Sequence, residues 1–153
     1  MKKFIYLISP SKIDKKFYNK LDSVLSYGNV KFFQLRIKKI KNNNIKNIVK
    51  KIRNITLRYN SKADGCHMGQ LDGSIEIAKR KLRNKILGIT CHNSKILAAN
   101  AIRDGANYLA FGSFFKSKLK PHAKKADLSI LKWSKKNIKK PIVVIGGITN
   151  LNY

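Results

Sequence analysis

Short apolar segments alternate along the chain with longer segments in which apolar residues recur every three or four positions. The short segments are typical of buried strands, and the longer ones of amphipathic helices. The predicted strands are residues 4–8, 30–38, 65–69, 86–90, 108–111 and 142–145. The helical stripes between them include Leu21 with Leu25, Ile48 with Ile52, Ala78 with Leu82, Leu97 with Ala101, and Ile130 with Leu131. The pattern predicts six strand–helix repeats, the last without its helix.

Turn and capping residues mark the ends of these segments. Gly28 and Gly105 follow helical stripes and are suited to end them. Side chains that can accept from the first helical N–H groups precede other stripes. These are Asn42–Asn44, Ser74, Asn93 or Ser94, and Asp127.

The alternation of strands and helices predicts an α/β fold with parallel strands and right-handed crossovers. A barrel and an open doubly wound sheet both satisfy this pattern. In either architecture, functional residues gather at the carboxyl ends of the strands. Polar residues at those positions are therefore the first candidates for a site.

Three such residues close the second predicted strand. Gln34, Arg36 and Lys38 are spaced by two, with Leu35 and Ile37 between them. Successive side chains of a strand point to opposite faces, so an amide, a guanidinium and an ammonium share one side. That set suits an anion such as a diphosphate. An antiparallel strand with one solvated face would give the same spacing.

Polar residues and glycines also follow the next four predicted strands. They are His67, Gln70 and Asp72; Thr90, His92 and Asn93; Ser113, Ser117 and Lys120; and Gly146 with Gly147. Plainer interpretations stand beside a site: a turn at Asp72-Gly73, hydrogen-bonded structural histidines, a solvated Lys120 and a tight turn at the glycine pair. Repetition at five strand ends favours a site.

Composition adds a strong positive charge. The chain has 34 Lys and Arg against 7 Asp and Glu, a net charge of +27. Such a charge attracts polyanions, but the basic runs lack the interleaved aromatic residues of a nucleic-acid surface. A compositional bias toward Lys accounts for it better, so nucleic acid is not an expected partner. The anion-binding set at residues 34–38 makes phosphorylated small molecules the expected partners.

The remaining composition favours a cytoplasmic protein. Cys66 and Cys91 are too few for a disulfide framework, which indicates a reducing compartment. Their Cys-His neighbours do not match a zinc spacing. The first apolar segment is expected to be a strand and not a signal peptide. No segment approaches the ~20 apolar residues of a membrane span.

Five motifs, in order, resemble the thiamine phosphate synthase family, whose thiazole tautomerase branch shares much of the pattern. They are residues 33–38 (FQLRIK), 63–72 (ADGCHMGQLD), 88–93 (GITCHN), 105–112 (GANYLAFG) and 145–148 (IGGI). The resemblance implies a (β/α)₈ barrel. It also implies Mg²⁺ and the joining of aminopyrimidine methyl diphosphate to a thiazole phosphate, with release of pyrophosphate.

The same resemblance implies roles for single residues. Gln34, Arg36, Lys38, Thr90 and Lys120 would bind the pyrimidine diphosphate, and Asp72 would bind magnesium. Ser117 and Gly147 would contact the thiazole phosphate. His92 stands where the tautomerase branch uses a histidine. No residue is identified as a certain catalyst.

The chemistry of the residues agrees with a diphosphate-releasing reaction. The seven acids include no pair spaced for general acid and base work, and no serine lies in a nucleophile elbow. Cations that stabilise a departing diphosphate would leave little covalent work to the protein.

Two departures from the family pattern change the expected architecture. One βα unit with an Asn-Asp strand end is missing near residues 60–62, and the final strand and helices after residue 153 are absent; Leu119 also replaces a threonine. Residues 1–153 are therefore expected to form a single domain, an incomplete TIM-barrel-like fold with about six of the usual eight parallel strands. The expected consequences are impaired or absent activity, or closure by a second copy as a homo-oligomer. A thiazole tautomerase-like protein and a non-catalytic polyanion-binding module are the alternatives.

Overall fold

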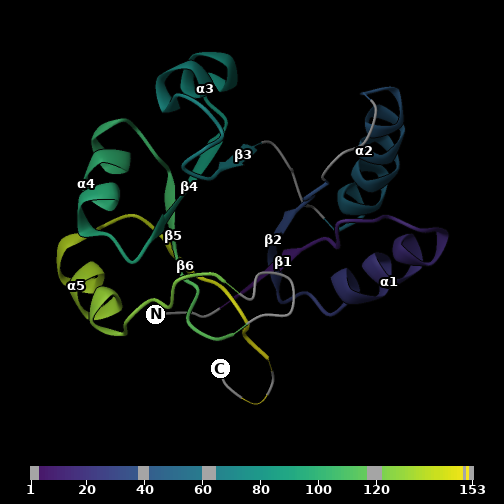
Figure 1. The fold of residues 1–153 in the computed structure, drawn as a ribbon. Coiled ribbons are helices and arrows are strands. Elements are labelled where there is room, and N and C mark those ends of the chain that lie inside the picture. The colour runs from purple at the N-terminus through teal and green to yellow at the C-terminus, as the bar shows by residue number, and fades with distance from the viewer. Residues whose placement is uncertain (1–3, 38–41, 60–64, 117–121, 150, 152–153) are drawn as a thin grey trace. The chain divides into compact units, whose positions relative to one another are not determined.

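A computed structural model describes residues 4–37, 42–59, 65–116, 122–149 and 151 (Figure 1). Strands and helices alternate through the described chain, as the sequence pattern predicts. The elements are β1 (Ile5–Ile8), α1 (Lys15–Ser26), β2 (Val30–Gln34), α2 (Asn42–Leu57), β3 (Gly65–Met68), α3 (Ile75–Leu82), β4 (Ile86–His92), α4 (Lys95–Arg103), β5 (Tyr108–Phe111), α5 (Ser129–Asn137) and β6 (Ile142–Val144). The chain forms two compact units, Met1–Ala63 and Asp64–Tyr153.

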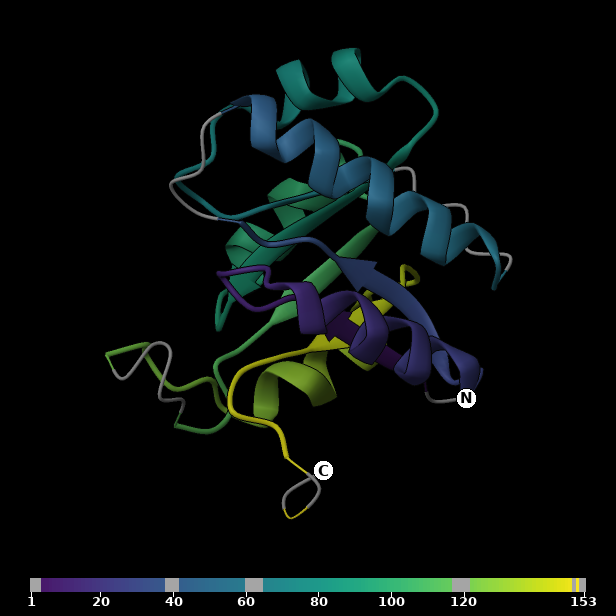
Figure 2. The same cartoon turned by 90° about the vertical axis from the view of Figure 1, so that its right-hand side faces the viewer.

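The first unit pairs β1 with β2 in parallel and packs α1 and α2 with them (Figure 2). Its buried core consists of the predicted stripe residues Leu21, Leu25 and Ile52 together with Ile55, which the predicted stripe of α2 did not include. Burial of such stripes supplies most of the stability of amphipathic helices.

The second unit is a four-stranded parallel sheet in the order β3-β4-β5-β6. Alternate residues of β4 and β5 point to one face, where Leu87, Ile89, Leu109 and Phe111 are almost completely buried. Helices α3, α4 and α5 contribute to this core, which places the three helices on one face of the sheet (Figure 1). The other face carries polar residues that matter for the site.

The predicted fold class is confirmed: an α/β fold with about six parallel strands. The described strands fall into two sheets, β1-β2 and β3-β4-β5-β6, so a continuous ladder from β2 to β3 is not seen in this part of the chain. The predicted deletion near 60–62 lies outside the described residues. No described helix is long and apolar enough to cross a bilayer.

One predicted strand is too long. The strand predicted for 30–38 ends at Gln34, so Arg36 lies beyond it and Lys38 is not described. Ser9 explains this end: its N–H donates to the Gln34 carbonyl at 2.9 Å, and its hydroxyl, in place of a backbone carbonyl, accepts from the Arg36 N–H at 2.8 Å. The Ser9 side chain thus takes the place of a backbone acceptor in the β1–β2 ladder, immediately before Pro10.

Helix capping follows the sequence closely. Ser74 and Ser94 accept from the N–H groups of Ile77 and Leu97, as N-cap residues do. Asp127 accepts from the Ser129 N–H at 2.7 Å, but the N-cap position of α5 is Leu128, one residue later than predicted.

Candidate functional site at the strand ends

The predicted site residues divide between the two units. Gln34 ends β2 and Arg36 lies two residues beyond it in the first unit, while Asp72, Thr90 and Gly147 belong to the second. Lys38, Ser117 and Lys120 lie outside the described residues. The structure describes each unit separately, so the convergence of all eight residues remains a prediction.

In the first unit, Gln34 is held at the end of β2. Its side-chain oxygen accepts from the Tyr6 hydroxyl at 3.2 Å, and Ser9 fixes the backbone on both sides of Leu35. An amide with an occupied oxygen keeps its N–H₂ group as a donor, which suits an anion. The predicted use of Gln34 as an anion contact is chemically consistent with this geometry.

In the second unit, the face opposite the helices carries a cross-strand row of three residues. His67 is in register with Gly88, and Gly88 with Tyr108. A Cβ on Gly88 would lie 1.9 Å from Cζ of Tyr108, so only glycine leaves room for the ring. The missing side chain thus allows the Tyr108 ring to lie over β4, beside His67.

His67 of β3 contacts the adjacent strand β4 and, across it, β5. Its Nδ1 lies 2.9 Å from the Tyr108 hydroxyl, its Nε2 lies 2.8 Å from Thr90 Oγ1, and its ring stacks on Tyr108 with centroids 5.6 Å apart. Burial lowers the pKa of His67 below its ordinary 6.5, and the charge of Asp72 opposes that shift. At neutral pH the imidazole is therefore uncharged.

Gln70 and Asp72, which follow β3, complete this polar group. The Gln70 amide donates to the Thr90 carbonyl. The carboxylate of Asp72 accepts from the Gly69 N–H at 2.7 Å while the Asp72 N–H donates to the Gly69 carbonyl at 3.3 Å. These two hydrogen bonds close a turn from Gly69 to Asp72. The turn holds the exposed Asp72 on the chain segment that leaves β3.

Asp72 fits a magnesium ion that is carried by a phosphorylated substrate. Such ions keep several waters and need only one or two protein carboxylates. Among the described residues, no group of three His, Cys, Asp or Glu could hold a metal by itself. The donor set therefore suits a substrate-bound Mg²⁺ and not an all-protein cage.

The loops after β5 and β6 lie directly against each other. The Phe114 and Phe115 N–H groups donate to the carbonyls of Ile145 and Gly146 at 3.2 and 3.0 Å. Gly147 has φ +66°, and a Cβ there would lie 2.4 Å from the Lys116 carbonyl oxygen. Glycine is required by this close approach.

His92 and Cys91, which lie side by side in the sequence at the end of β4, differ in their surroundings. His92 ends β4 with φ 52°, its carbonyl accepts from the Gly112 N–H, and its side chain is exposed. Burial raises the pKa of the Cys91 thiol to about 12, so this cysteine is an inert core residue.

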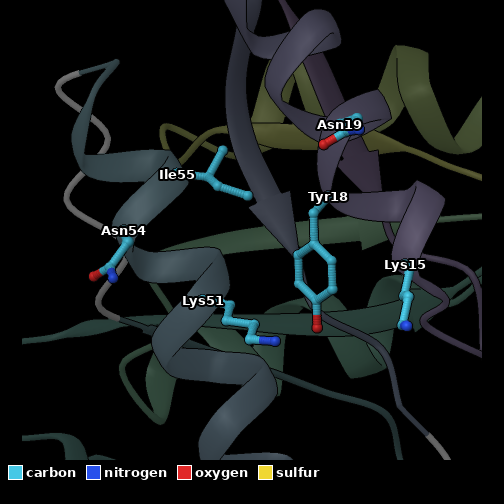
Figure 3. Close-up of a pocket in the computed structure, with 6 residues that line it drawn as sticks. All are labelled: Lys15, Tyr18, Asn19, Lys51, Asn54 and Ile55. Atoms are coloured by element: carbon cyan, nitrogen blue, oxygen red, sulfur yellow. The ribbon is translucent and has the colours of Figure 1, made fainter.

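A surface pocket lies elsewhere, between α1 and α2 (Figure 3). It is lined by Lys15, Tyr18, Asn19, Lys51, Asn54 and Ile55, and the Lys51 ammonium lies 5.6 Å from the Tyr18 ring centroid. None of the predicted site residues lines it. Helix side chains, and not strand ends, form this pocket.

Tyr108 is the part of the site that the sequence analysis missed. The signal was present in the pairing of a small and a large residue on adjacent strands, Gly88 and Tyr108. It could be recognised only once the register of β4 and β5 was known. The plainer interpretation of His67, a hydrogen-bonded structural histidine, agrees with the contacts of both of its ring nitrogens.

Comparisons with known proteins agree with the predicted resemblance. The sequence model of the thiamine monophosphate synthase family matches residues 5–153. A thiamine-phosphate synthase of Pelagibacter ubique is 48% identical over 99% of this chain and 81% of its own length. One of Erythrobacter litoralis is 37% identical over 95% of this chain and 77% of its own length.

A solved structure extends the similarity to the fold. A thiamine phosphate pyrophosphorylase from Pyrococcus furiosus superposes with a TM-score of 0.81 at 28% identity. The match covers 95% of this chain and 76% of that protein. Sequence and structure therefore agree that the chain belongs to the thiamine monophosphate synthase family and resembles the thiamine-phosphate synthases, which are transferases.

Proposed function

We propose that this protein joins aminopyrimidine methyl diphosphate to a thiazole phosphate and releases pyrophosphate, as a step of thiamine biosynthesis in the cytoplasm. The observation that carries the proposal is the family match over residues 5–153, with 48% identity to a thiamine-phosphate synthase. The absence of a paired acid and base from the sequence agrees with a reaction that needs charge stabilisation more than proton transfer.

The proposed chemistry is a displacement at the pyrimidine methyl carbon. The carbon–oxygen bond breaks and its electron pair leaves with pyrophosphate. The thiazole nitrogen then supplies the electron pair of the new carbon–nitrogen bond. The protein orients the two substrates and stabilises the negative charge on the leaving group.

Family membership supports a role for each predicted residue. Gln34, Arg36 and Thr90 would bind the diphosphate by charge and hydrogen bonds, together with Lys38 and Lys120. Ser117 and Gly147 would contact the thiazole phosphate. Asp72 would hold the Mg²⁺, which when bound supplies positive charge to the diphosphate.

We also propose that a shortened fold reduces the rate. The alignment with the Pelagibacter relative spans 167 positions, and this chain has 153 residues, so at least 167 − 153 = 14 positions of the relative have no counterpart here. Loss of an internal βα unit near 60–62 would explain such a gap. Fewer ligands for Mg²⁺ and diphosphate would then slow bond breaking.

The direct test is product formation. The purified chain is mixed with both substrates and Mg²⁺, and thiamine phosphate is measured beside the Pelagibacter enzyme at equal concentration. We expect measurable product at a lower rate than the relative gives. Absence of product contradicts the proposed reaction, and a rate equal to that of the relative contradicts the proposed impairment.

A matched pair of variants tests the site. Arg36→Ala removes a predicted diphosphate contact, and Lys15→Ala removes a cation at the α1–α2 pocket of the same unit. Loss of a charged hydrogen bond costs about 1.5–3 kcal/mol, which corresponds to roughly 10–150-fold in kcat/KM. Only Arg36→Ala is expected to lose activity. Equal losses in both variants would contradict a specific site.

A further inference from the structure

Three side chains in the second unit form a hydrogen-bonded chain from β5 through β3 to β4. The Tyr108 hydroxyl contacts His67 Nδ1 at 2.9 Å, and His67 Nε2 contacts Thr90 Oγ1 at 2.8 Å. All three belong to the sheet face opposite the helices. The His67–Thr90 contact joins the adjacent strands β3 and β4, and the Tyr108–His67 contact passes over Gly88 of β4, so both fix side chains against the sheet.

The direction of these hydrogen bonds decides what Thr90 can do. A neutral imidazole has one donor nitrogen and one acceptor nitrogen. If Nε2–H donates to Thr90, the threonine proton remains available for another acceptor. If Nδ1–H donates to Tyr108 instead, Thr90 must donate its proton to Nε2 and has none left for a ligand.

The chemistry of the end groups favours the first direction. A phenol is more acidic than an aliphatic alcohol and is the better donor to the basic imidazole nitrogen. Tyr108 is therefore suited to donate to Nδ1, which leaves the proton on Nε2. Thr90 then accepts from His67 and can donate outward.

The backbone around Thr90 is fixed as well. The Gln70 amide donates to the Thr90 carbonyl, and Thr90 pairs in register with Ala110 of β5. The Thr90 side chain is half-buried, so it is shielded by the protein and still reaches solvent. A hydroxyl held in this way is pre-organised for an anion.

We propose that Tyr108 and His67 are positioning residues. Tyr108 holds His67 in the Nε2–H tautomer, and His67 in this form makes Thr90 an outward hydrogen-bond donor to a substrate diphosphate. The identity of the ligand rests on the proposed function. The tautomer does not, because it is a property of the protein without substrate.

The tautomer is read directly by ¹H–¹⁵N NMR of the imidazole nitrogens in the free protein at neutral pH. The His67 signals are identified by their loss in His67→Gln. We expect a protonated Nε2 and an unprotonated Nδ1, and a loss of this preference in Tyr108→Phe, which keeps the ring over Gly88 but removes the hydroxyl. A protonated Nδ1 in the wild-type protein overturns the inference.

Two replacements of His67 separate its two contacts. The amide of glutamine reaches the position of Nε2, and that of asparagine reaches the position of Nδ1. His67→Gln therefore keeps a donor for Thr90, whereas His67→Asn does not. Thermal unfolding of each variant reports whether the fold is kept.

Binding is measured by titration with inorganic pyrophosphate and Mg²⁺. Thr90→Val and His67→Asn are expected to weaken binding about tenfold, and His67→Gln by less than about threefold, since one charged hydrogen bond is at stake. Equal effects of His67→Gln and His67→Asn in folded proteins overturn the inference. Absence of pyrophosphate binding by the wild-type protein contradicts the proposed function, whatever the tautomer, so the two failures are distinguishable.

Discussion

At the scale of single residues, Gly88 determines where the polar row can form. Its missing side chain leaves the space that the Tyr108 ring fills, and Tyr108 in turn contacts His67. A β-strand glycine is otherwise unfavourable, so its presence in a four-stranded sheet reflects this close contact.

Gly88→Ala is therefore expected to displace Tyr108. A Cβ placed 1.9 Å from Cζ of Tyr108 cannot be accommodated without movement, and overpacking of this kind costs about 1–3 kcal/mol. Urea unfolding measures the loss. Gly69→Ala is the control, because its Cβ would lie at an ordinary 3.4 Å from Oδ2 of Asp72. Equal stability of Gly88→Ala and the wild-type protein would contradict the described packing.

His67 gives the protein a predictable response to acid. Burial lowers its pKa in the folded protein, so between that value and 6.5 the unfolded chain binds a proton that the folded protein does not. Above pH 6.5, His67 therefore does not lower the free energy of unfolding. As the pH falls below 6.5, the free energy of unfolding decreases. The slope from this group is at most about 1.4 kcal/mol for each pH unit.

Thermal unfolding between pH 7.5 and 5 tests this response. The wild-type protein is expected to lose stability over that range more steeply than His67→Gln, which cannot titrate at this position. His92 and His122 are present in both proteins and cancel in the comparison. Parallel pH profiles would show that burial of His67 does not control this response.

At the scale of elements, local sequence patterns predicted most of the structure. Helical stripes such as Leu21 with Leu25 fix which face is buried, and Ser74 and Ser94 fix where helices begin. The end of β2 could not be predicted from its own alternation, because the Arg36 N–H donates to the side chain of Ser9, 27 residues earlier, and not to a backbone carbonyl. The Tyr108–His67 pair could not be predicted either, because the strand register that brings these two residues together is not visible in either strand alone.

Capping of α1 offers a test at this scale. Oδ1 of Asp14 accepts from the Phe17 N–H at 2.7 Å, at the end of the helix where negative charge is favourable. Asp14→Ala is expected to lower the free energy of unfolding by about 1 kcal/mol. Asp14→Asn keeps the acceptor and should lose only a few tenths of that value. A larger effect for Asn than for Ala in denaturant unfolding would be inconsistent with capping.

At the scale of the whole molecule, the order of motifs along the chain predicted the family and the α/β class. The division into two units was not predicted, because contacts between distant segments are not visible in local periodicity. Three of the predicted site residues, Lys38, Ser117 and Lys120, are outside the described residues.

The net charge of +27 predicts a salt-dependent stability. Like charges repel most in the compact state, and added salt screens them over about 10 Å at 0.1 M. The Tm is expected to rise between 10 mM and 300 mM NaCl. The rise should be about 2–4 °C for each kcal/mol by which screening increases the free energy of unfolding. KCl at equal ionic strength should give the same rise. An unchanged or lower Tm would indicate that repulsion does not limit stability.

Calorimetric titration of aminopyrimidine methyl diphosphate with Mg²⁺, at about 150 mM salt, tests most directly whether the strand ends bind a diphosphate. Screening at this salt concentration suppresses attraction by general positive charge. The wild-type chain and Lys15→Ala are expected to bind equally, and Arg36→Ala at least about tenfold more weakly. No binding by the wild-type chain, or equal weakening by both substitutions, would contradict the account.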